Sequence, residues 1–543
     1  MIRFRVFLVY PPPWKKGKRR EKDSNMQSQK VCDTPTHLSP PYKGGLGGFL
    51  NQSTVLRRET TEPAADRWSF VAIIYVFHII LFWFSNPKVA TGETHPKSDS
   101  FCVQELPQKI DKIITDPESA SRWGIMIQPW FSQEVVYQRN ADQFFIPAST
   151  VKLFTSAIAL NQLNPNFQIV TPIYTEGNPP DLEELKIIGR GDPTLTTNDL
   201  ETLAETLKKQ GVRSLKRIVL ETGYLPSPAI NSTWEWEDVY AAYGTGINDF
   251  ILDENSVTLT LRPQALGEAV SIAWNNAIAA SQWKLNNQAT TAPPNTNYQI
   301  ELQGNLGTSQ LSLSGKLPQR IKKDVWNLAI PNPNHYFRDQ LLNTLAKQGI
   351  TVNQVQFLPI SPTQMTDTKL MTFASPPLEE LVGELNRESN NLYAEALLKI
   401  LIAETNPEMI EQALIGFGLF PNDYQLADGS GLSRRNLATP SAIAQLLQGM
   451  LSSENAEIFQ SSLAVAGVSG TLKNRFQGTE LQGNLQGKTG TLTGISALSG
   501  YLNPPSYQPL VFSILLNHSQ LSASEQREKI DRILLLLWQI KQC

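Results

Sequence analysis

The chain has 543 residues, which is long enough for about two to four domains with hydrophobic cores of their own. Hydrophobic residues make up 41% of it and charged residues 18%, a composition that indicates a globular protein and excludes a largely disordered one. The net charge is −3, but residues 1–67 hold 13 Lys/Arg against 6 Asp/Glu, or +7, so the rest carries −10. Because phosphate binding needs a basic face, this acidic body predicts no nucleic-acid partner.

An apolar run divides the N-terminal region from the rest of the chain. Residues 1–66 are rich in Pro, Gly and Lys and predict a basic tail of low structure. Residues 67–85 contain 17 consecutive residues, Trp68–Phe84, that carry no formal charge while His78 is neutral. This length is near the lower limit for a membrane helix, so we expect a transmembrane anchor or signal segment rather than a buried core helix. Residues 86–100 follow as a linker.

The charges around the apolar run predict its orientation. Arg57, Arg58 and Arg67 precede it, and the residues after it are less basic. By the positive-inside rule the N-terminus then stays in the cytoplasm and everything after Phe84 is exported. No small-x-small cleavage site follows the run, which favours an uncleaved membrane anchor over a cleaved signal peptide.

The residue pattern of the exported body changes twice, after residue 170 and after residue 374. Residues 101–170 and 375–543 show helical periodicity and apolar strands, which predicts one discontinuous α/β domain with a sheet packed beneath helices. Residues 171–374 show many short β-type runs broken by Asn, Gly and Pro, which predicts an inserted α+β module rich in strands. Strands are expected at 123–136, 256–263, 298–305, 308–315, 485–502 and 509–517. Helices are expected at 147–160, 199–211, 335–349, 378–404 (as a pair) and 524–543.

Two cysteines lie at the ends of the exported body. Cys102 and Cys543 fall in a compartment that permits disulfides, whereas Cys32 falls on the cytoplasmic side. A disulfide between Cys102 and Cys543 is therefore favoured over two unpaired thiols. Such a bond requires the first and the last element of the body to be neighbours in the fold.

The motifs of several reaction classes are missing from the sequence. Only His335 and His518 lie beyond residue 95, and neither belongs to a Gly-x-Ser-x-Gly setting, so a histidine-based triad is not predicted. Cys-x-x-Cys, His-Glu-x-x-His and the phosphate-binding Gly-x-x-x-x-Gly-Lys-Ser/Thr are absent as well. We therefore expect neither a catalytic metal nor another cofactor.

A Ser-x-x-Lys motif is the first candidate for nucleophile chemistry. A serine without histidine needs another base, and a lysine whose pKa is lowered by burial or by a second cation can serve. Ser149 and Lys152 stand three residues apart where a helix begins, so their side chains share one face. The same spacing occurs at Ser85 and Ser281, and an N-cap serine followed by a solvated lysine would also explain it. The motif alone decides nothing.

Two further motifs supply partners for this serine. Lys488 stands in the single Lys-Thr-Gly of the chain and offers a second cation, while Thr489 and Thr491 offer hydroxyls to a carboxylate. Ser389 and Asn391 form a Ser-x-Asn element, whose hydroxyl can relay a proton and whose amide can hold a peptide group. Only the three motifs in this order are specific.

This ordered set resembles that of the penicillin-binding proteins and serine β-lactamases. Longer segments are similar to the class C low-molecular-mass penicillin-binding proteins, the D-alanyl-D-alanine carboxypeptidase/endopeptidase family called peptidase S13. The resemblance covers Phe101 to Cys543 and implies an α/β (α+β) serine β-lactamase/transpeptidase-like domain with a large β-rich inserted module. The segments are GRGDPTL (189–195), WEWEDVYAAYG (234–244), NRESNNLYAEALL (386–398), DGSGLSRRNLATP (428–440), GTLKNRF (470–476) and GKTGTLTGISALSGYL (487–502).

The resemblance implies a catalytic role for five residues, Ser149, Lys152, Ser389, Asn391 and Lys488. The first serine would attack the carbonyl between two D-alanines and form an acyl-enzyme, and Lys152 would take its proton. The second serine and the Lys-Thr-Gly lysine would relay a proton to the leaving amine, while the asparagine holds the substrate amide. Water would then release the peptide.

Substrate binding is assigned to Thr489, Gly490 and Thr491. The two threonines would bind the terminal carboxylate. The backbone N–H groups of Ser149 and Thr491 would form an oxyanion hole, a contribution usually worth a few kcal/mol. The implied partners are peptidoglycan stem peptides ending in D-Ala-D-Ala, and β-lactam antibiotics that acylate the same serine.

Other residues of the similar segments receive structural interpretations. Asp428 lies in a Gly/Ser-rich turn that would shape the cleft, and Glu395 lies on a helix after the Ser-x-Asn element. Trp234 and Trp236 are expected in the core. One departure from the family is Glu221, which is followed by threonine where relatives commonly carry an acidic pair.

A β-lactamase and a non-catalytic peptidoglycan-binding scaffold are the alternatives. The chain is far longer than a β-lactamase needs, and no Glu-x-x-x-Asn deacylation element stands near the Ser-x-Asn. A scaffold would not need Ser149, Lys152 and Lys488 all intact. The sequence does not distinguish a carboxypeptidase from an endopeptidase.

Overall fold

The computed structural model describes residues 100–115, 121–132, 134–305, 307–361 and 368–543. The predicted tail and anchor, residues 1–85, lie outside this part of the chain, as does nearly all of the predicted linker. Among the described residues, no helix is both long and apolar enough to cross a membrane.

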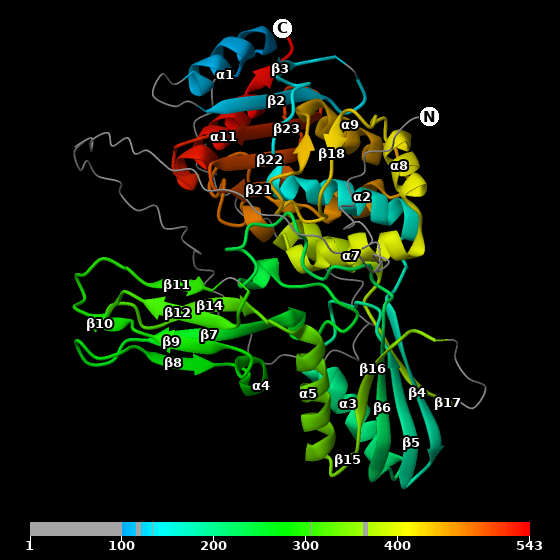
Figure 1. The fold of residues 1–543 in the computed structure, drawn as a ribbon. Helices are drawn as coiled ribbons and strands as arrows, with labels where there is room; N and C mark the ends of the chain where they lie inside the picture. The colour runs from blue at the N-terminus through cyan, green and yellow to red at the C-terminus, as the bar shows by residue number, and fades with distance from the viewer. Residues whose placement is uncertain (1–99, 116–120, 133, 306, 362–367) are drawn as a thin grey trace, which may run out of the picture. The chain divides into compact units, whose positions relative to one another are not determined.

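A six-stranded antiparallel sheet joins the early and late parts of the described chain (Figure 1). Its strand order is β20-β21-β22-β23-β2-β3. The register places Trp123 opposite Leu516 and Gly490 opposite Ala497. The strands are β2 (Arg122–Pro129), β3 (Tyr137–Arg139), β20 (Ala464–Val465), β21 (Leu485–Leu492), β22 (Ile495–Leu502) and β23 (Leu510–Asn517). The strand β2 pairs directly with β23, so segments nearly 400 residues apart in sequence lie side by side.

The first strand is shorter than the predicted run at 123–136. It ends at Pro129, and the Ser132 hydroxyl oxygen then accepts a hydrogen bond from the Glu134 N–H at 3.0 Å. This local bond favours a turn over continued pairing, so pairing resumes only at β3.

Helices cover both faces of the sheet. On one face Trp123, Ile125 and Ile127 of β2 share an apolar cluster with α1 (Leu106–Ile114) and α11 (Ala523–Trp538). The opposite face packs against a second cluster that is built around α2. The result is a three-layered helix-sheet-helix arrangement. The sequence predicts a sheet packed beneath helices, and the structure adds helices on the second face.

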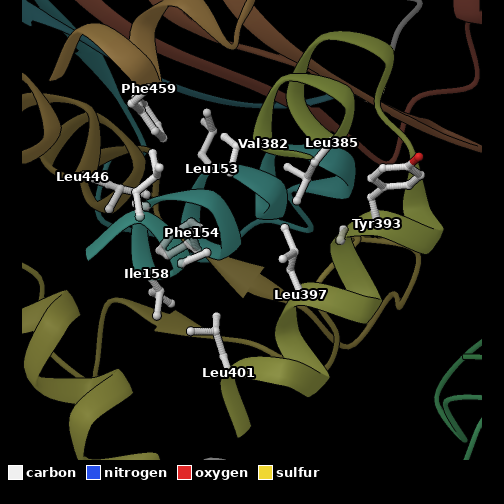
Figure 2. Close-up of a cluster of buried hydrophobic side chains, with 14 of the residues drawn as sticks. Leu153, Phe154, Ile158, Val382, Leu385, Tyr393, Leu397, Leu401, Leu446 and Phe459 are labelled. Atoms are coloured by element: carbon white, nitrogen blue, oxygen red, sulfur yellow. The ribbon is translucent and has the colours of Figure 1, made fainter. Parts of the chain in front are cut away.

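The helix α2 (Lys152–Leu163) lies at the centre of the second cluster. Ten of its twelve residues are buried. Figure 2 shows Leu153, Phe154 and Ile158 of α2 among apolar side chains of the neighbouring helices. Burying each such side chain fully stabilises the fold by about 1.5–3 kcal/mol, so α2 is a rigid base for the residues at its start. The neighbouring helices are α6 (Leu378–Gly383), α7 (Asn391–Glu404), α8 (Pro407–Gly416), α9 (Pro440–Leu451) and α10 (Ala456–Ser461).

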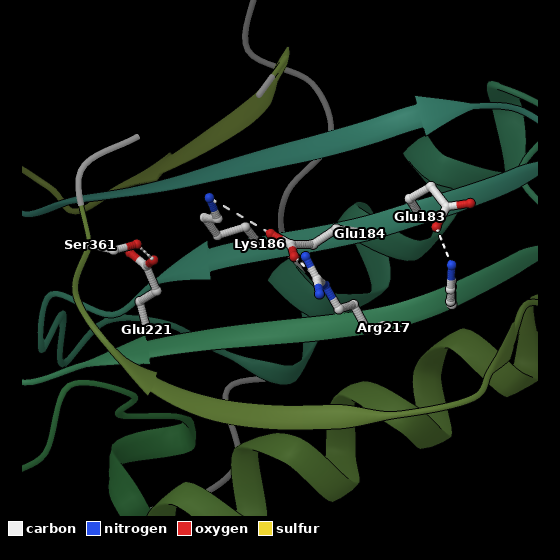
Figure 3. A network of polar contacts seen from close by, with 7 residues as sticks. Glu183, Glu184, Lys186, Arg217, Glu221 and Ser361 are labelled. Atoms are coloured by element: carbon white, nitrogen blue, oxygen red, sulfur yellow. Dashed lines mark hydrogen bonds and ion pairs between the residues drawn. The ribbon is translucent and has the colours of Figure 1, made fainter. Parts of the chain in front are cut away.

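A second six-stranded sheet occupies the middle of the chain. Its order is β15-β6-β5-β4-β17, and β16 pairs with β6. Figure 3 shows polar contacts on it: Arg217 Nε donates to Glu184 Oε2 at 2.5 Å, and Ser361 Oγ donates to the buried Glu221 Oε1 at 2.7 Å. The strands are β4 (Val170–Asn178), β5 (Asp181–Ile188), β6 (Ser214–Thr222), β15 (Thr351–Val352), β16 (Val355–Pro359) and β17 (Thr368–Ala374).

Five of the other elements of this middle part correspond to predicted ones. The predicted helices are α3 (Thr197–Lys209) and α5 (Pro333–Lys347), and the predicted strands are β7 (Ser256–Arg262), β11 (Glu301–Gly304) and β12 (Gln310–Ser314). Small sheets are completed by β8 (Ser271–Trp274), β9 (Lys284–Asn287), β10 (Thr290–Ala292), β13 (Lys316–Pro318) and β14 (Asp324–Ala329). The domain boundaries at residues 170 and 375 stay a prediction.

The last helix is also shorter than predicted. It ends at Trp538, and β24 (Ile540–Lys541) then pairs in parallel with β1 (Phe101–Cys102). Ile540 is buried in the cluster beneath the sheet, which holds the chain end extended. Cys543 is joined to Cys102 by a disulfide, so the first and last elements of the body are neighbours.

Removing this disulfide is expected to lower the free energy of unfolding by about 2–4 kcal/mol. The bond links cysteines 441 residues apart, and it therefore restricts the unfolded chain strongly. The double variant Cys102→Ser/Cys543→Ser avoids a free thiol and should unfold at a lower Tm than the wild type. Equal Tm values for the two proteins in thermal unfolding would contradict the expectation.

Candidate active site

Ser149 lies on a tight turn directly before α2. The turn is a 3-10 helix, Ala148–Val151, and no side chain caps either this turn or α2. The N-cap explanation of the motif is therefore wrong. Ala148 has a φ of 50°, a left-handed conformation that costs roughly 1–2 kcal/mol in a residue other than glycine. Strain of this kind persists where the surroundings fix the backbone, which is common at functional sites.

Two glycines let neighbouring segments close on this turn. A Cβ at Gly431 would lie 2.0 Å from Ala148 O, and one at Gly490 would lie 2.8 Å from Pro147 O. Gly490 is buried, and its missing side chain lets β21 approach the turn. The structure thus explains this glycine by packing, and its contact with substrate stays a prediction.

Lys152 is fully buried in the first turn of α2, and its amine has three oxygen neighbours. Nζ lies 3.2 Å from Ser149 Oγ, 2.7 Å from Asn391 Oδ1 and 2.7 Å from Ser430 O. The two shorter contacts are to carbonyl oxygens, which only accept hydrogen bonds. A neutral amine has two N–H groups, and both are used there. Its lone pair is then left to receive the hydroxyl proton of Ser149.

The surroundings of Lys152 favour this neutral form. Burial lowers the pKa of Lys152 from 10.5 to about 7, although the negative charges of Asp428 and Glu395 act in the opposite direction. A large share of the amine is therefore neutral near pH 7. The serine hydroxyl and a competent base lie within reach of each other without any histidine.

Ser389 lies on a break between the two helices that the sequence predicts as a pair. The helix α6 runs into a π-helical turn, Glu384–Glu388, and Ser389 then adopts a left-handed φ of 65° before α7 begins. This break turns the hydroxyl toward β21, where Lys488 Nζ donates to Ser389 Oγ at 2.7 Å. Single π turns inside helices occur frequently at functional sites.

Lys488 is a second buried amine. Burial lowers its pKa well below 10.5, and the charge of Lys152 lowers it further. Two amines that oppose each other's protonation in this way favour a state with one cation and one neutral base. The pair can therefore supply both a proton acceptor and a proton donor.

The two threonines of β21 share one face of the strand, because side chains two residues apart point the same way. Thr489 is half-buried and donates from Oγ1 to Thr471 Oγ1 at 2.8 Å, and Thr491 is exposed. Hydroxyls on an accessible strand face suit a carboxylate. Binding of a carboxylate by these residues stays a prediction.

Asp428 and Glu395 hold the loop that carries Ser430. Glu395 Oε1 accepts hydrogen bonds from the backbone N–H groups of Gly429 and Ser430 at 2.9 and 2.8 Å. Asp428 accepts one from the indole N–H of Trp234 at 2.9 Å, and two more from backbone N–H groups of its own loop. The two acids thus position the Ser430 carbonyl, which accepts a hydrogen bond from Lys152. The sequence predicts a structural role for both acids, but it does not predict that the Ser430 carbonyl contacts Lys152.

Tyr243 joins the middle part of the chain to the site. Asn391 Nδ2 donates to Tyr243 O at 3.0 Å, and the Tyr243 hydroxyl donates to Asp238 Oδ1 at 2.8 Å. The sequence analysis did not single out this tyrosine, although it lies in a segment similar to the family. Trp236 of that segment is 45% exposed, so its expected core position is wrong, because it lies in a surface turn. Trp234 is buried as expected.

The other described Ser-x-x-Lys pair is not assembled in this way. Ser281 Oγ donates to Ile278 O at 2.7 Å, and Lys284 is exposed at the start of β9. The third such pair, at Ser85, lies outside the described residues. No group of three or more His, Cys, Asp and Glu side chains in the described part of the chain is arranged to hold a metal ion.

Residues 106–537 match the model of the D-Ala-D-Ala carboxypeptidase 3 (S13) family, which covers most of the chain. The chain belongs to this family. It is a serine-type peptidase, and the prediction of the family from the motifs is confirmed.

Proteins from three other organisms are similar to this S13 family member. A D-alanyl-D-alanine carboxypeptidase from Actinomadura sp. (strain R39) is 30% identical over 444 residues, which cover 76% of this chain and 81% of the relative. Penicillin-sensitive carboxypeptidase A from Dictyostelium discoideum is 25% identical over 522 residues, which cover 87% of this chain and 98% of the relative. Penicillin binding protein 4 from Haemophilus influenzae has a crystal structure similar to this one, with a TM-score of 0.69 and 24% identity over 81% of this chain and 98% of that chain. The predicted fold class is confirmed.

Acylation of this S13 family member by a β-lactam is expected to become faster as the pH rises through about 7. Lys152 accepts a proton only when neutral, and its pKa is lowered to about 7, so the rate should be low below this pH and level off above it. Rates of labelling by a fluorescent penicillin across the pH range measure the midpoint. A midpoint near the ordinary lysine value of 10.5 would show that burial does not perturb this amine.

Proposed function

We propose that the chain is a serine D-Ala-D-Ala carboxypeptidase that acts on peptidoglycan stem peptides through an acyl-enzyme on Ser149. The observation that supports this most strongly is the setting of Lys152. Its amine lies 3.2 Å from Ser149 Oγ, while Asn391 Oδ1 and Ser430 O occupy its two N–H groups. The lone pair of the base is thereby directed at the hydroxyl.

Acylation begins when Ser149 Oγ attacks the carbonyl carbon between the two D-alanines. The hydroxyl proton passes to Lys152, and the negative charge that develops on the carbonyl oxygen is held by the backbone N–H groups of Ser149 and Thr491. The C–N bond then breaks, and the leaving amine takes the proton of the Ser389 hydroxyl. Lys488, which donates to that hydroxyl at 2.7 Å, replaces the proton.

Recognition of the substrate falls on the remaining motif residues. Asn391 holds the peptide amide, and Thr489 and Thr491 bind the terminal carboxylate, with Gly490 between them on β21. Lys488 directly precedes them in the same strand, so an amine and two hydroxyls from one motif are available to an anion. Water then attacks the acyl carbon and releases the shortened peptide. A β-lactam acylates the same serine and so acts as an inhibitor.

We place the catalytic body in the periplasm, held at the inner membrane by residues 67–85. The uncharged run Trp68–Phe84 and the arginines before it support this placement. The body consists of a discontinuous domain, 101–170 and 375–543, and an inserted module, 171–374. An oxidising compartment also suits the disulfide at the ends of the body.

Release of D-alanine from a pentapeptide ending in D-Ala-D-Ala tests this function directly. The assay is run before and after the addition of benzylpenicillin in an amount equimolar to the protein. We expect release to stop in proportion to the penicillin bound, and the peptide that contains Ser149 to gain the mass of the antibiotic. Folded protein that binds penicillin but releases no D-alanine would favour the scaffold, and rapid turnover of penicillin would favour a β-lactamase. A cross-linked dimeric substrate assayed in parallel measures endopeptidase activity.

A further inference from the structure

A pocket lies at the far end of α2 from Ser149. Its volume is about 720 Å³, which is within the range of roughly 300–1,000 Å³ that is usual for small-molecule sites. Asn161 and Gln162 line it from the C-terminal end of α2, about 15 Å along the helix axis from Lys152. The neighbouring helices α8 and α9 form other walls and contact α2 (Figure 1). The catalytic machinery described above makes no use of this pocket.

The pocket is polar but uncharged. The amides of Gln412, Gln445 and Gln448 and the hydroxyl of Ser452 line it, and none of the described lining residues carries a charge. Amides both donate and accept hydrogen bonds, as do hydroxyl and acetamido groups of a ligand. Phosphates, carboxylates and ammonium groups need a charged partner to bind well, so they fit this lining poorly.

Two aromatic side chains give the pocket an apolar side. Phe131 is 79% exposed, although phenylalanine is usually buried. Trp130 stands beside it, with ring centroids 6.2 Å apart, and is held by its indole N–H, which donates to Leu510 O at 3.0 Å. A fixed ring and an exposed ring thus flank a set of amides. A sugar ring, with an apolar C–H face and a rim of hydroxyls, has the matching chemistry.

Gln448 contributes a fixed amide to the wall of this pocket. Its Nε2 donates to Pro129 O at 2.7 Å and to Ser132 O at 3.0 Å, which holds the amide in one orientation. Its Oε1 has no hydrogen-bond partner among the described residues, although the side chain is buried. This oxygen is itself shielded from solvent, so Gln448 contributes to the pocket through the fixed position of its side chain and not through a free acceptor.

We propose that this pocket binds an uncharged N-acetylated sugar of a glycan chain. The identity of the polymer rests on the proposed function, because the stem peptides of peptidoglycan project from a glycan of such sugars. A sugar bound here would keep the enzyme on the polymer while Ser149, at the other end of α2, acts on a stem peptide.

Glycine residues of the pocket wall provide a way to fill it. A Cβ at Gly449 would lie 2.7 Å from Phe417 O, so this position is already closely packed. A Cβ at Gly416, the last residue of α8, would meet nothing within 4 Å. The Cβ of a leucine at Gly416 therefore meets no neighbour, and the substitution adds side-chain atoms at the pocket wall, in a helix where glycine is a poor helix former.

Titration of the full chain with chitotetraose, an uncharged chain of N-acetylglucosamine, tests the proposal by calorimetry. We expect saturable binding by the wild type. Phe131→Ala and Gly416→Leu should each weaken it at least about tenfold. Phe420→Ala is the matched control, because it removes an aromatic side chain that is 63% exposed but does not line the pocket. This control should bind as the wild type does.

Labelling of Ser149 by penicillin in the same variants separates this proposal from the proposed function. It should be equal in all of them, since none touches the catalytic residues. Failure of labelling in the wild type would count against the proposed function, whereas failure of sugar binding alone would count against the pocket. The pocket proposal is overturned by any of three results: no saturable binding, equal binding by Gly416→Leu, or loss of binding after acylation with penicillin.

Discussion

Replacing Ser149 with alanine is expected to abolish both covalent labelling by a fluorescent penicillin and the release of D-alanine. Ser149 Oγ, 3.2 Å from Lys152 Nζ, is the atom that we propose forms the acyl bond, and alanine has no such atom. Removing the nucleophile from catalytic residues that act as a unit lowers kcat on the order of a million-fold. Gel fluorescence after incubation with the antibiotic measures the first effect, and a D-alanine assay measures the second.

Ser281→Ala is the matched control for this variant. Ser281 has the same Ser-x-x-Lys spacing, but its hydroxyl donates to Ile278 O of the short helix Ala277–Ala280, which ends directly before it. It should therefore keep full labelling and full activity. A Tm equal to that of the wild type in thermal unfolding would show that Ser149→Ala is folded. Labelling that persists in this folded protein would disprove the assignment of the nucleophile.

The order of three short motifs predicts which side chains meet in the site. Lys152 and Asn391 are 239 residues apart and Ser389 and Lys488 are 99 apart, yet both pairs form hydrogen bonds at 2.7 Å. Local periodicity places Ser149 and Lys152 on one face, but it says nothing about these distant pairs. The family resemblance supplies that information, because a shared fold brings the same motifs together.

The supports of Lys152 carry no comparable sequence signal. Ser430 contributes a backbone carbonyl, and Tyr243 offers its own backbone carbonyl to Asn391. Every residue type has such a group, so only the path of the chain decides which one is used. The residues at which helices and strands end are not predicted correctly for a related reason. At Pro129 and Trp538 a local turn or a neighbouring strand ends the element, although the apolar pattern continues.

Burial shifts the pKa values of two groups near the nucleophile, Lys152 and Glu395, in the direction that favours their uncharged forms. Burial lowers the pKa of Lys152 to about 7, and burial together with the charge of Asp428 raises the pKa of Glu395. Either group could therefore produce a pH-dependent rate. The hydrogen bonds favour Lys152, because Glu395 contacts the backbone of the 429–430 loop rather than Ser149. A substitution at each position distinguishes the two.

Replacing Lys152 with methionine is expected to slow acylation by about 100- to 10,000-fold. Methionine fills a similar buried volume but has no amine, so Ser149 loses its proton acceptor and the barrier rises by about 3–5 kcal/mol. Stopped-flow acylation by a β-lactam measures the rate. Lys284→Met is the matched control, since Lys284 belongs to the other described Ser-x-x-Lys pair and is exposed. Its acylation rate should equal that of the wild type.

The pH profile of the same variants separates a base from a merely structural lysine. In the wild type the rate should rise through about pH 7, and in Lys152→Met the residual rate should be flat there because the titrating amine is gone. Glu395→Gln keeps an oxygen that accepts from the N–H groups of Gly429 and Ser430, so it should keep the rise. If the rise survives in Lys152→Met and disappears in Glu395→Gln, the carboxylate is the titrating group and the assignment of Lys152 as the base is wrong.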